Sequence, residues 1–214
     1  MPCNCCEMEN NTFGEEEAKA NLKDYRRRGP AKQTIMILEA VRSLGLKQAS
    51  LLDIGGGIGT IHHELLKDVA SEATHVDASS AYLKIATEEA KRLGHSEQVK
   101  FIHADFTDVA ADLPQADVVT LDRVVCCYPN MHELLKAASS KSRKAISMTY
   151  PREVWYIKAV IAAMNFFQRL RKDPFRVFVH PIHEMETLLK REGLQRIATR
   201  RLFVWEMALY QKTT

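Results

Sequence analysis

The sequence predicts an α/β fold of the Rossmann-like, doubly wound type, built on a mostly parallel seven-stranded sheet. Strand patterns alternate with helical patterns between residues 50 and 149, as is typical of parallel strands joined by helical crossovers. A glycine-rich turn directly follows the first of these strands. The last residues of the chain show two strand patterns with a very short connection, and such strands pair as a C-terminal antiparallel hairpin.

Two helices are expected before the sheet. Residues 15–28 are rich in helix formers and end at a Gly-Pro pair, which stops a helix. Residues 32–43 repeat apolar side chains at helical spacing. We therefore expect an N-terminal tail and helix over residues 1–30 and the main domain over residues 31–214.

The elements of the main domain follow from short apolar runs and longer periodic segments. Strands are expected at residues 50–54, 74–77, 99–104, 117–121, 144–149, 195–201 and 203–211. Helices between them are expected at residues 61–67 and 80–93 and from about residue 130. Each crossover helix returns the chain to the same edge of the sheet, so the ends of the parallel strands should lie together.

A helical insert is expected after the fifth strand, at about residues 151–180. Its helix, residues 154–172, has a single narrow polar stripe, and apolar residues such as Trp155 occupy the rest. A helix this apolar should be covered nearly all round. It would be a core helix beneath the following loop, a lid over an apolar substrate, a dimer face or a peripheral membrane contact. It is too short and too interrupted to span a bilayer.

Composition and charge indicate an ordinary globular protein. The apolar fraction is 46% and the net charge is +3, and no face or tail concentrates that charge. We therefore expect a small-molecule partner and no nucleic acid, with the chain acting as a monomer or a homodimer. The N-terminus lacks the apolar core of a signal peptide, which predicts a cytoplasmic protein.

The cysteines and paired histidines do not suggest a metal site. Three thiols, Cys3, Cys5 and Cys6, lie in the tail and lack the spacing of paired zinc knuckles. His62 and His63 should point to different sides of a helix. We expect free thiols and no metal ligands.

The most informative segment is the glycine-rich turn, which reads Asp53-x-Gly55-x-Gly57-x-Gly59. Glycines let a backbone turn tightly and approach a bound molecule closely. The dinucleotide fingerprint needs a third glycine where this chain has Thr60. The pattern instead resembles the first motif of class I S-adenosylmethionine-dependent methyltransferases, and the resemblance implies S-adenosylmethionine as cofactor.

Acids at the ends of later strands strengthen this resemblance. Asp77, followed by Ala78, stands where an acid can accept hydrogen bonds from ribose hydroxyls. Asp105 and Phe106 match the family's adenine-binding pair, in which the acid accepts from the amino group and its neighbour packs on the ring. The end of the fourth strand resembles the family's fourth motif, which implies that Asp122 lies beside the cofactor and the transferred methyl.

The segment from Asp122 to Pro129 also resembles magnesium-protoporphyrin O-methyltransferases, which methylate a propionate carboxylate. In that family a histidine commonly stands at the position of Cys127, so the tetrapyrrole substrate does not carry over with the reaction. The candidate catalytic residues are Asp122, Tyr128 and His132. The candidate acceptor-binding residues are Tyr25, Cys127, Tyr128 and Trp155.

These patterns predict a small-molecule methyltransferase that favours oxygen as the acceptor atom, with sulfur and nitrogen as the alternatives. A nicotinamide-dependent oxidoreductase is the second hypothesis, although Thr60 and the absence of a Tyr-x-x-x-Lys pattern argue against it. The third is a non-catalytic scaffolding protein that keeps the fold and the cofactor. The acids Asp53, Asp77 and Asp105 favour cofactor binding in either case.

Overall fold

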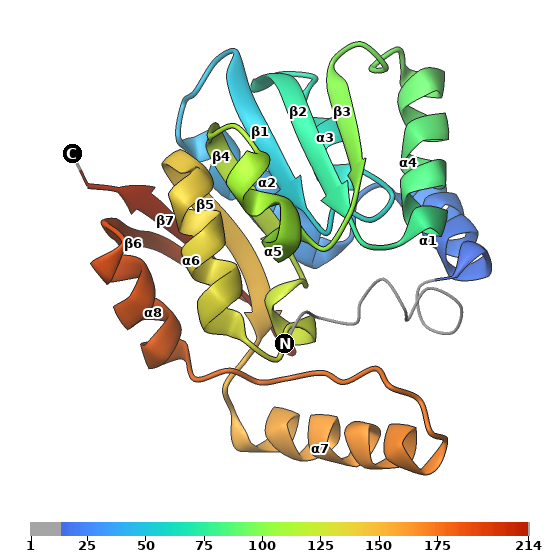
Figure 1. The fold of residues 1–214 in the computed structure, drawn as a ribbon, viewed down its shortest axis with the longest axis vertical. Coiled ribbons are helices and arrows are strands. Elements are labelled where there is room, and N and C mark those ends of the chain that lie inside the picture. Colours follow the sequence, from blue (N-terminus) through green and yellow to red (C-terminus); the bar gives the residue numbers. More distant parts are fainter. Residues whose placement is uncertain (1–13, 214) are drawn as a thin grey trace.

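The computed structural model describes residues 14–213, which form three layers with a sheet between two sets of helices (Figure 1). The sheet has seven strands in the order β3-β2-β1-β4-β5-β7-β6. The strands are β1 (Ala49–Ile54), β2 (Ala70–Asp77), β3 (Val99–His103), β4 (Ala116–Asp122), β5 (Ser142–Pro151), β6 (Leu194–Arg201) and β7 (Trp205–Lys212). The first five are parallel, and β7 runs antiparallel to β5 and β6. The predicted fold class is confirmed.

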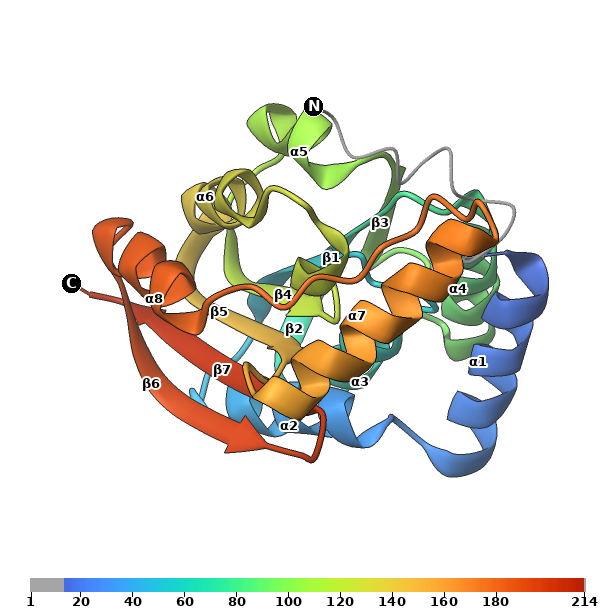
Figure 2. The ribbon, with the colours of Figure 1, turned by 90° about the horizontal axis from the view of Figure 1, so that it is seen from below.

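The helices are α1 (Glu15–Arg28), α2 (Lys32–Ser43), α3 (Thr60–Leu65), α4 (Ser80–Leu93), α5 (Phe106–Val109), α6 (Met131–Lys141), α7 (Trp155–Leu170) and α8 (Ile182–Arg191). Helices α1 to α4 lie on one side of the sheet, and α5, α6 and α8 lie on the other (Figure 2). The predicted bounds of α1, α2 and α4 are confirmed. Sequence reasoning missed α5 and the 3₁₀ turns at residues 110–112 and 125–127, because such short elements carry no periodic signal.

The alternation of side chains along β1 divides the apolar core into two layers. Leu51 belongs to the cluster that packs against α2, where Ile37 and Val41 are wholly buried. Leu52 belongs to the cluster on the opposite face, together with Leu134 of α6. Burying each of these side chains contributes about 1.5–3 kcal/mol to the stability of the fold. This packing on both faces of the sheet holds the strands and their ends in place.

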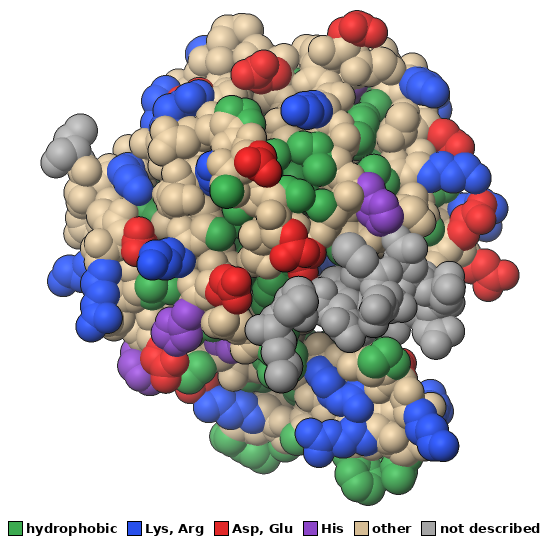
Figure 3. Space-filling view, viewed as in Figure 1, with side chains coloured by type: hydrophobic (Ala, Val, Ile, Leu, Met, Phe, Trp, Pro, Cys, Tyr) green, Lys and Arg blue, Asp and Glu red, His purple; other side chains and the backbone are tan. Residues whose placement is uncertain are grey.

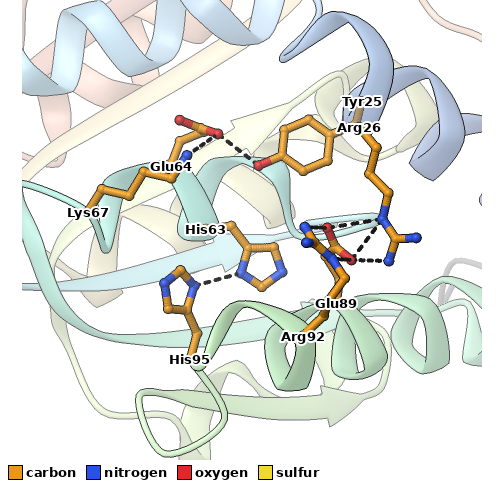
Figure 4. Close-up of polar contacts among 8 residues, drawn as sticks. All are labelled: Tyr25, Arg26, His63, Glu64, Lys67, Glu89, Arg92 and His95. Atoms are coloured by element: carbon orange, nitrogen blue, oxygen red, sulfur yellow. Dashed lines mark hydrogen bonds and ion pairs between the residues drawn. The ribbon is translucent and has the colours of Figure 1, made fainter.

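Helix α1 is held to α4 by one buried carboxylate (Figure 4). Glu89 is wholly buried, and it accepts hydrogen bonds from Arg92 on its own helix and from Arg26 on α1. The Arg92 hydrogen bond is the main cause that lowers the pKa of Glu89 to about 2, and Arg26 acts in the same direction. The ion pairs therefore stabilise the docking of α1 beside the glycine turn.

Helix α7 lies outside both helical layers, across the carboxyl ends of the parallel strands (Figures 1 and 2). Ile157 is its one buried residue, whereas the exposed fraction is 80% for Trp155 and 59% for Phe167. The expectation of a core helix covered nearly all round is therefore wrong, because none of the residues described here packs over its outer side. Apolar and basic side chains gather in this region of the surface (Figure 3).

Across residues 14–213, α7 included, no helix combines the length and the hydropathy that crossing a membrane would require.

The Glu89 ion pairs give a prediction about stability. We expect Glu89→Gln to lower the free energy of unfolding by about 1–2 kcal/mol, because two ion pairs are lost while both arginines stay accessible to water. The folded pKa lies below the ordinary value of 4.5, so this stabilisation is present above about pH 4.5 and is lost as the pH falls towards 2. Urea titration of both proteins at neutral and acidic pH measures it, and a difference that does not shrink in acid would contradict the prediction.

Candidate functional site

The turn between β1 and α3 is the centre of the site. Its three motif glycines, Gly55, Gly57 and Gly59, have φ values of 59°, 57° and 84°, in the left-handed region that favours glycine. A Cβ atom at Gly55 would lie 2.6 Å from the Val124 side chain, and one at Gly59 would lie 2.5 Å from the ring of His62. The sequence of the turn is therefore dictated by both backbone conformation and space.

Asp77 ends β2 and holds the turn through its carboxylate. One oxygen accepts from the backbone N–H of Gly57 at 2.8 Å, and the other accepts from the N–H of Ser79 at 2.8 Å. Burial raises the pKa of Asp77 to about 6. The carboxylate keeps accessible lone pairs, so it can also accept from ligand hydroxyls. Ala78 follows it, half-buried, with its carbonyl oxygen 3.0 Å from Nε2 of His103.

Asp105 follows β3 and begins α5. Its Oδ1 atom accepts from the backbone N–H and the hydroxyl of Thr107, each at 3.0 Å, and from the hydroxyl of Tyr128. Its Oδ2 atom is buried and has no hydrogen-bond partner among the described residues. Buried polar atoms normally have a partner, so this oxygen fits a ligand donor such as an adenine amino group.

Two predicted ligand contacts take other roles in the structure. Phe106 is 3% exposed and packs in the core with Leu52 and Val76, so it presents no free ring face to a ligand. Tyr128 is 8% exposed and its hydroxyl donates to Asp105. In the structure Tyr128 positions Asp105, and a direct role of its hydroxyl towards the acceptor stays a prediction.

Asp122 lies at the carboxyl end of β4, as expected, and both of its oxygens are engaged. Thr34 of α2 donates its hydroxyl at 2.6 Å, and Thr149 of β5 donates at 2.5 Å. Arg123 follows with a φ of 62°, and its backbone N–H donates to the Thr149 hydroxyl at 2.9 Å. Sequence reasoning missed Thr34, Thr149 and Arg123. The strand-end position of Thr149 was an available signal, whereas nothing distinguishes Thr34 from a core residue.

The remaining acceptor-side candidates are not brought together. Tyr25 donates its hydroxyl to Glu64 at 2.8 Å and so joins α1 to α3 (Figure 4). Nε2 of His132 lies 3.4 Å from the Glu184 carboxylate at the surface, and its catalytic role stays a prediction. Trp155 is largely exposed at the start of α7.

Cys127 lies in the turn after β4, within 3.9 Å of the buried Cys126 sulfur. The hydrogen bond between the two thiols is the main cause that lowers the pKa of Cys127. Cys3, Cys5 and Cys6 lie outside the described residues.

Asp53 lies beneath the turn rather than in it. It is wholly buried, and it accepts from the hydroxyl of Thr120 at 2.8 Å while its second oxygen lies 3.2 Å from Nδ1 of His62. The predicted direct contact between Asp53 and a cofactor is therefore not available in this conformation. Asp53 supports the turn from below.

Two histidine pairs lie in this part of the structure, one of them beside Asp53, and sequence reasoning did not anticipate them. His62 lies 3.3 Å from His75 between Nδ1 atoms, and His63 lies 3.2 Å from His95 in the same way (Figure 4). Burial lowers the pKa of His62 and of His75 to about 3, so both rings are neutral at physiological pH. The neighbours His62 and His63 do point to different partners, but Asp53, His62 and His75 form a group that could hold a metal ion.

Comparison with known proteins identifies the domain. Residues 51–145 match the family model of the methyltransferase domain. Magnesium protoporphyrin IX methyltransferase from Synechocystis PCC 6803, crystallised with bound SAH, is a structural neighbour with a TM-score of 0.71 and 14% identity, over 94% of this chain and 98% of that chain. A comparison with curated protein sequences finds no match.

Two O-methyltransferase structures are also similar. An O-methyltransferase family protein from Burkholderia thailandensis has a TM-score of 0.73 and 14% identity, over 97% of this chain and 62% of that chain. An O-methyltransferase family 2 protein from Planctomyces limnophilus DSM 3776, in complex with apigenin, has a TM-score of 0.68 and 17% identity, over 95% and 63%. At such identities the likeness shows the fold.

Residues 51–145 therefore match a methyltransferase domain, and this match indicates S-adenosylmethionine as the cofactor. The match favours this reading over the hypothesis of a nicotinamide oxidoreductase. The site fits the cofactor on its own evidence, because the turn has no Cβ at its motif positions and Asp105 has a buried oxygen without a partner.

The raised pKa of Asp77 gives a prediction about cofactor affinity. We expect Asp77→Asn to weaken S-adenosylhomocysteine binding about 10-fold or more at pH 7.5, because hydrogen bonds to a charged group contribute about 1.5–3 kcal/mol. Wild-type affinity should fall as the pH falls through about 6, where the carboxylate becomes protonated, and the variant should lose this dependence. Titration calorimetry measures both, with Asp24→Asn on the exposed face of α1 as control. Equal affinities for the two variants would refute the assignment of Asp77.

Proposed function

We propose that this methyltransferase transfers the methyl group to an oxygen atom of an apolar small molecule, and that this oxygen is already ionised when the acceptor binds. The observation that carries the proposal is the engagement of the polar groups around the end of β4. Asp122 accepts two hydroxyls, and the Tyr128 hydroxyl is bound to Asp105. His180 lies 2.9 Å from the Tyr128 carbonyl oxygen, with which its ring N–H can pair.

These contacts limit the chemical class of acceptor that can react. When bound, S-adenosylmethionine supplies a sulfonium methyl group that an aligned nucleophile displaces. Holding the reactants in line can contribute about 7–11 kcal/mol. A neutral hydroxyl or amine must also lose a proton to a base, whereas a carboxylate or an acidic phenolate arrives without one. The described acids and histidines of this region already have hydrogen-bond partners. An ionised oxygen needs no base to remove a proton, so it is the acceptor that suits this site best.

Arg123 supplies the charge that would draw such an acceptor. Its side chain is 49% exposed at the end of β4, where its Nε atom lies 3.8 Å from Oδ1 of Asp122, and its positive charge also acts on Cys127 in the following turn and on Tyr82 of α4. A guanidinium can pair with a carboxylate through two parallel hydrogen bonds. We therefore assign to Arg123 the binding of the acceptor's anionic group.

Helix α7 supplies the apolar surface. Asn165 of α7 exchanges two hydrogen bonds with Val177, at 2.7 and 3.0 Å, in the segment that returns from the helix. In the same segment the Phe178 N–H donates to the Cys126 carbonyl at 2.7 Å, which fixes the segment against the turn after β4. Helix α7 is thus tied to the end of β4, and its exposed aromatic residues provide a wall for an apolar acceptor. The neighbours named for magnesium protoporphyrin IX and for a complex with apigenin support a small-molecule acceptor.

An acceptor screen with radiolabelled S-adenosylmethionine tests the proposal. The panel should pair porphyrin carboxylates and aromatic carboxylic acids with their amides, and acidic phenols with alcohols, thiols and amines. We expect label in the ionisable oxygen acceptors only. Transfer to amines or alcohols at comparable rates would contradict the proposal, and S-adenosylhomocysteine binding without transfer to any class would favour the non-catalytic alternative.

The role of Arg123 predicts a specific kinetic change. We expect Arg123→Ala to raise KM for an acidic acceptor by about 10- to 100-fold, because one charge-assisted pair is lost, while the dissociation constant for S-adenosylhomocysteine stays the same. Arg143→Ala is the matched control, since this arginine is 47% exposed and pairs with Asp117 at the other end of β4. An unchanged KM in the Arg123 variant would reject the assignment.

The role of α7 predicts that its aromatic residues affect the acceptor and not the fold. Phe166 and Phe167 are 57% and 59% exposed, so replacing both by serine should leave the melting temperature nearly unchanged. We expect KM for an apolar acceptor to rise at least about 10-fold, since each ring contributes up to about 1.5–3 kcal/mol when it is buried by a ligand. Ile197→Ser on β6, 49% exposed, is the control. A lowered melting temperature with unchanged KM would show that the rings serve stability instead.

A further inference from the structure

Three buried side chains meet directly beneath the glycine turn, and methyl transfer has no use for two of them. Asp53 ends β1, His62 lies on α3, and His75 is the residue paired with Asp53 on the neighbouring strand β2. All three are wholly buried. One ligand atom from each lies within 4.8 Å of the other two.

Hydrogen bonds satisfy this group poorly. Nδ1 of His62 lies 3.2 Å from Oδ2 of Asp53 and 3.3 Å from Nδ1 of His75. A neutral imidazole nitrogen carries either one proton or one lone pair. If His62 Nδ1 carries the proton, Asp53 and the lone pair of His75 must share that one proton. If His62 Nδ1 carries the lone pair and accepts from His75, the same lone pair faces the carboxylate oxygen of Asp53. A cation placed among the three atoms accepts a lone pair from each.

The distances match a tetrahedral metal centre. Bonds from zinc to nitrogen or oxygen of about 2.0–2.2 Å place neighbouring ligand atoms about 3.3–3.6 Å apart. The two separations at His62 lie close to that range. Thr120 donates to the second oxygen of Asp53 at 2.8 Å, the kind of hydrogen bond that orients a ligating carboxylate. Ligation through Nδ1 puts the ring proton of each histidine on Nε2, and neither Nε2 atom has a partner among the described residues, so each of these protons needs a water molecule as acceptor.

We propose that Asp53, His62 and His75 bind a divalent transition-metal ion, for which Zn²⁺ is the best fit, with a water molecule as the fourth ligand. Two neutral imidazoles and one carboxylate are ligands that zinc prefers. The ion joins β1, α3 and β2 at one point. Sequence spacing does not reveal the site, because its residues come from three elements that only the fold brings together.

The glycine turn rests on this metal site. A Cβ atom at Gly56 would lie 2.6 Å from the ring of His75 and 2.8 Å from Oδ2 of Asp53. Gly56 is not one of the three motif glycines, and this contact explains why a side chain is absent there. Given the proposed function, removal of the ion should also weaken cofactor binding, because the floor of the turn loses its cross-link.

Metal binding by the full chain tests the proposal. The tail thiols could bind zinc independently, so the parent protein should carry Cys3→Ser, Cys5→Ser and Cys6→Ser. After treatment with a chelator, calorimetry with ZnCl₂ should give one ion per chain, and zinc should raise the melting temperature. We expect His75→Asn to weaken zinc binding at least about 100-fold, whereas the exposed His132→Gln should behave as the parent.

A folded parent protein that binds no zinc would overturn the proposal, as would equal zinc affinity in the His75 and His132 variants. If His75→Asn does not fold, zinc binding is measured with Asp53→Asn instead, and the visible absorption spectrum of the parent protein loaded with Co²⁺ is recorded. An intense tetrahedral spectrum supports the site, and the spectrum of the hydrated ion refutes it. These measurements need neither S-adenosylmethionine nor an acceptor, so their failure is distinguishable from a failure of the proposed function.

Discussion

The turn after β1 is confined from several sides, and the geometry of the site depends on this confinement. Val124 limits the space at Gly55, the ring of Tyr82 lies 3.6 Å from a Cβ built at Gly57, and the Asp77 carboxylate accepts the Gly57 N–H. These contacts come from the segment after β4, from α4 and from β2. The shape of the turn is therefore a property of the strand order, and a shift of any neighbouring strand would change the surface offered to the cofactor.

The fold and the cofactor-side acids could be predicted because both follow from local patterns. Apolar runs of strand length and a glycine turn define the parallel sheet, and the ends of its strands place Asp77 and Asp105 at one edge. The roles of Tyr128 and His132 could not be predicted in the same way. The direction of the Tyr128 hydroxyl depends on the preceding 3₁₀ turn at residues 125–127. The rotation of α6 about its axis directs His132 towards Glu184 of α8. Neither is encoded in periodicity.

The expectation for α7 shows what hydropathy leaves open. Its composition indicates that the helix should be covered, but hydropathy does not specify by what, and the described chain leaves most of it exposed. The buried histidines are the opposite case, because they are polar residues that the fold covers. His62 and His75 read as ordinary polar positions, yet the register that pairs Asp53 with His75 places them in the interior. Tertiary contacts decide both cases.

The attachment of α7 has a consequence for evolution. The helix is joined to the rest of the protein by β5 on one side and by a hydrogen-bonded return segment on the other, and it buries a single side chain. Substitutions on its surface thus carry almost no folding penalty. Given the proposed role of α7 in acceptor binding, a lineage can exchange residues there and change the compounds it recognises while the glycine turn stays unaltered, so acceptor specificity can drift independently of the fold.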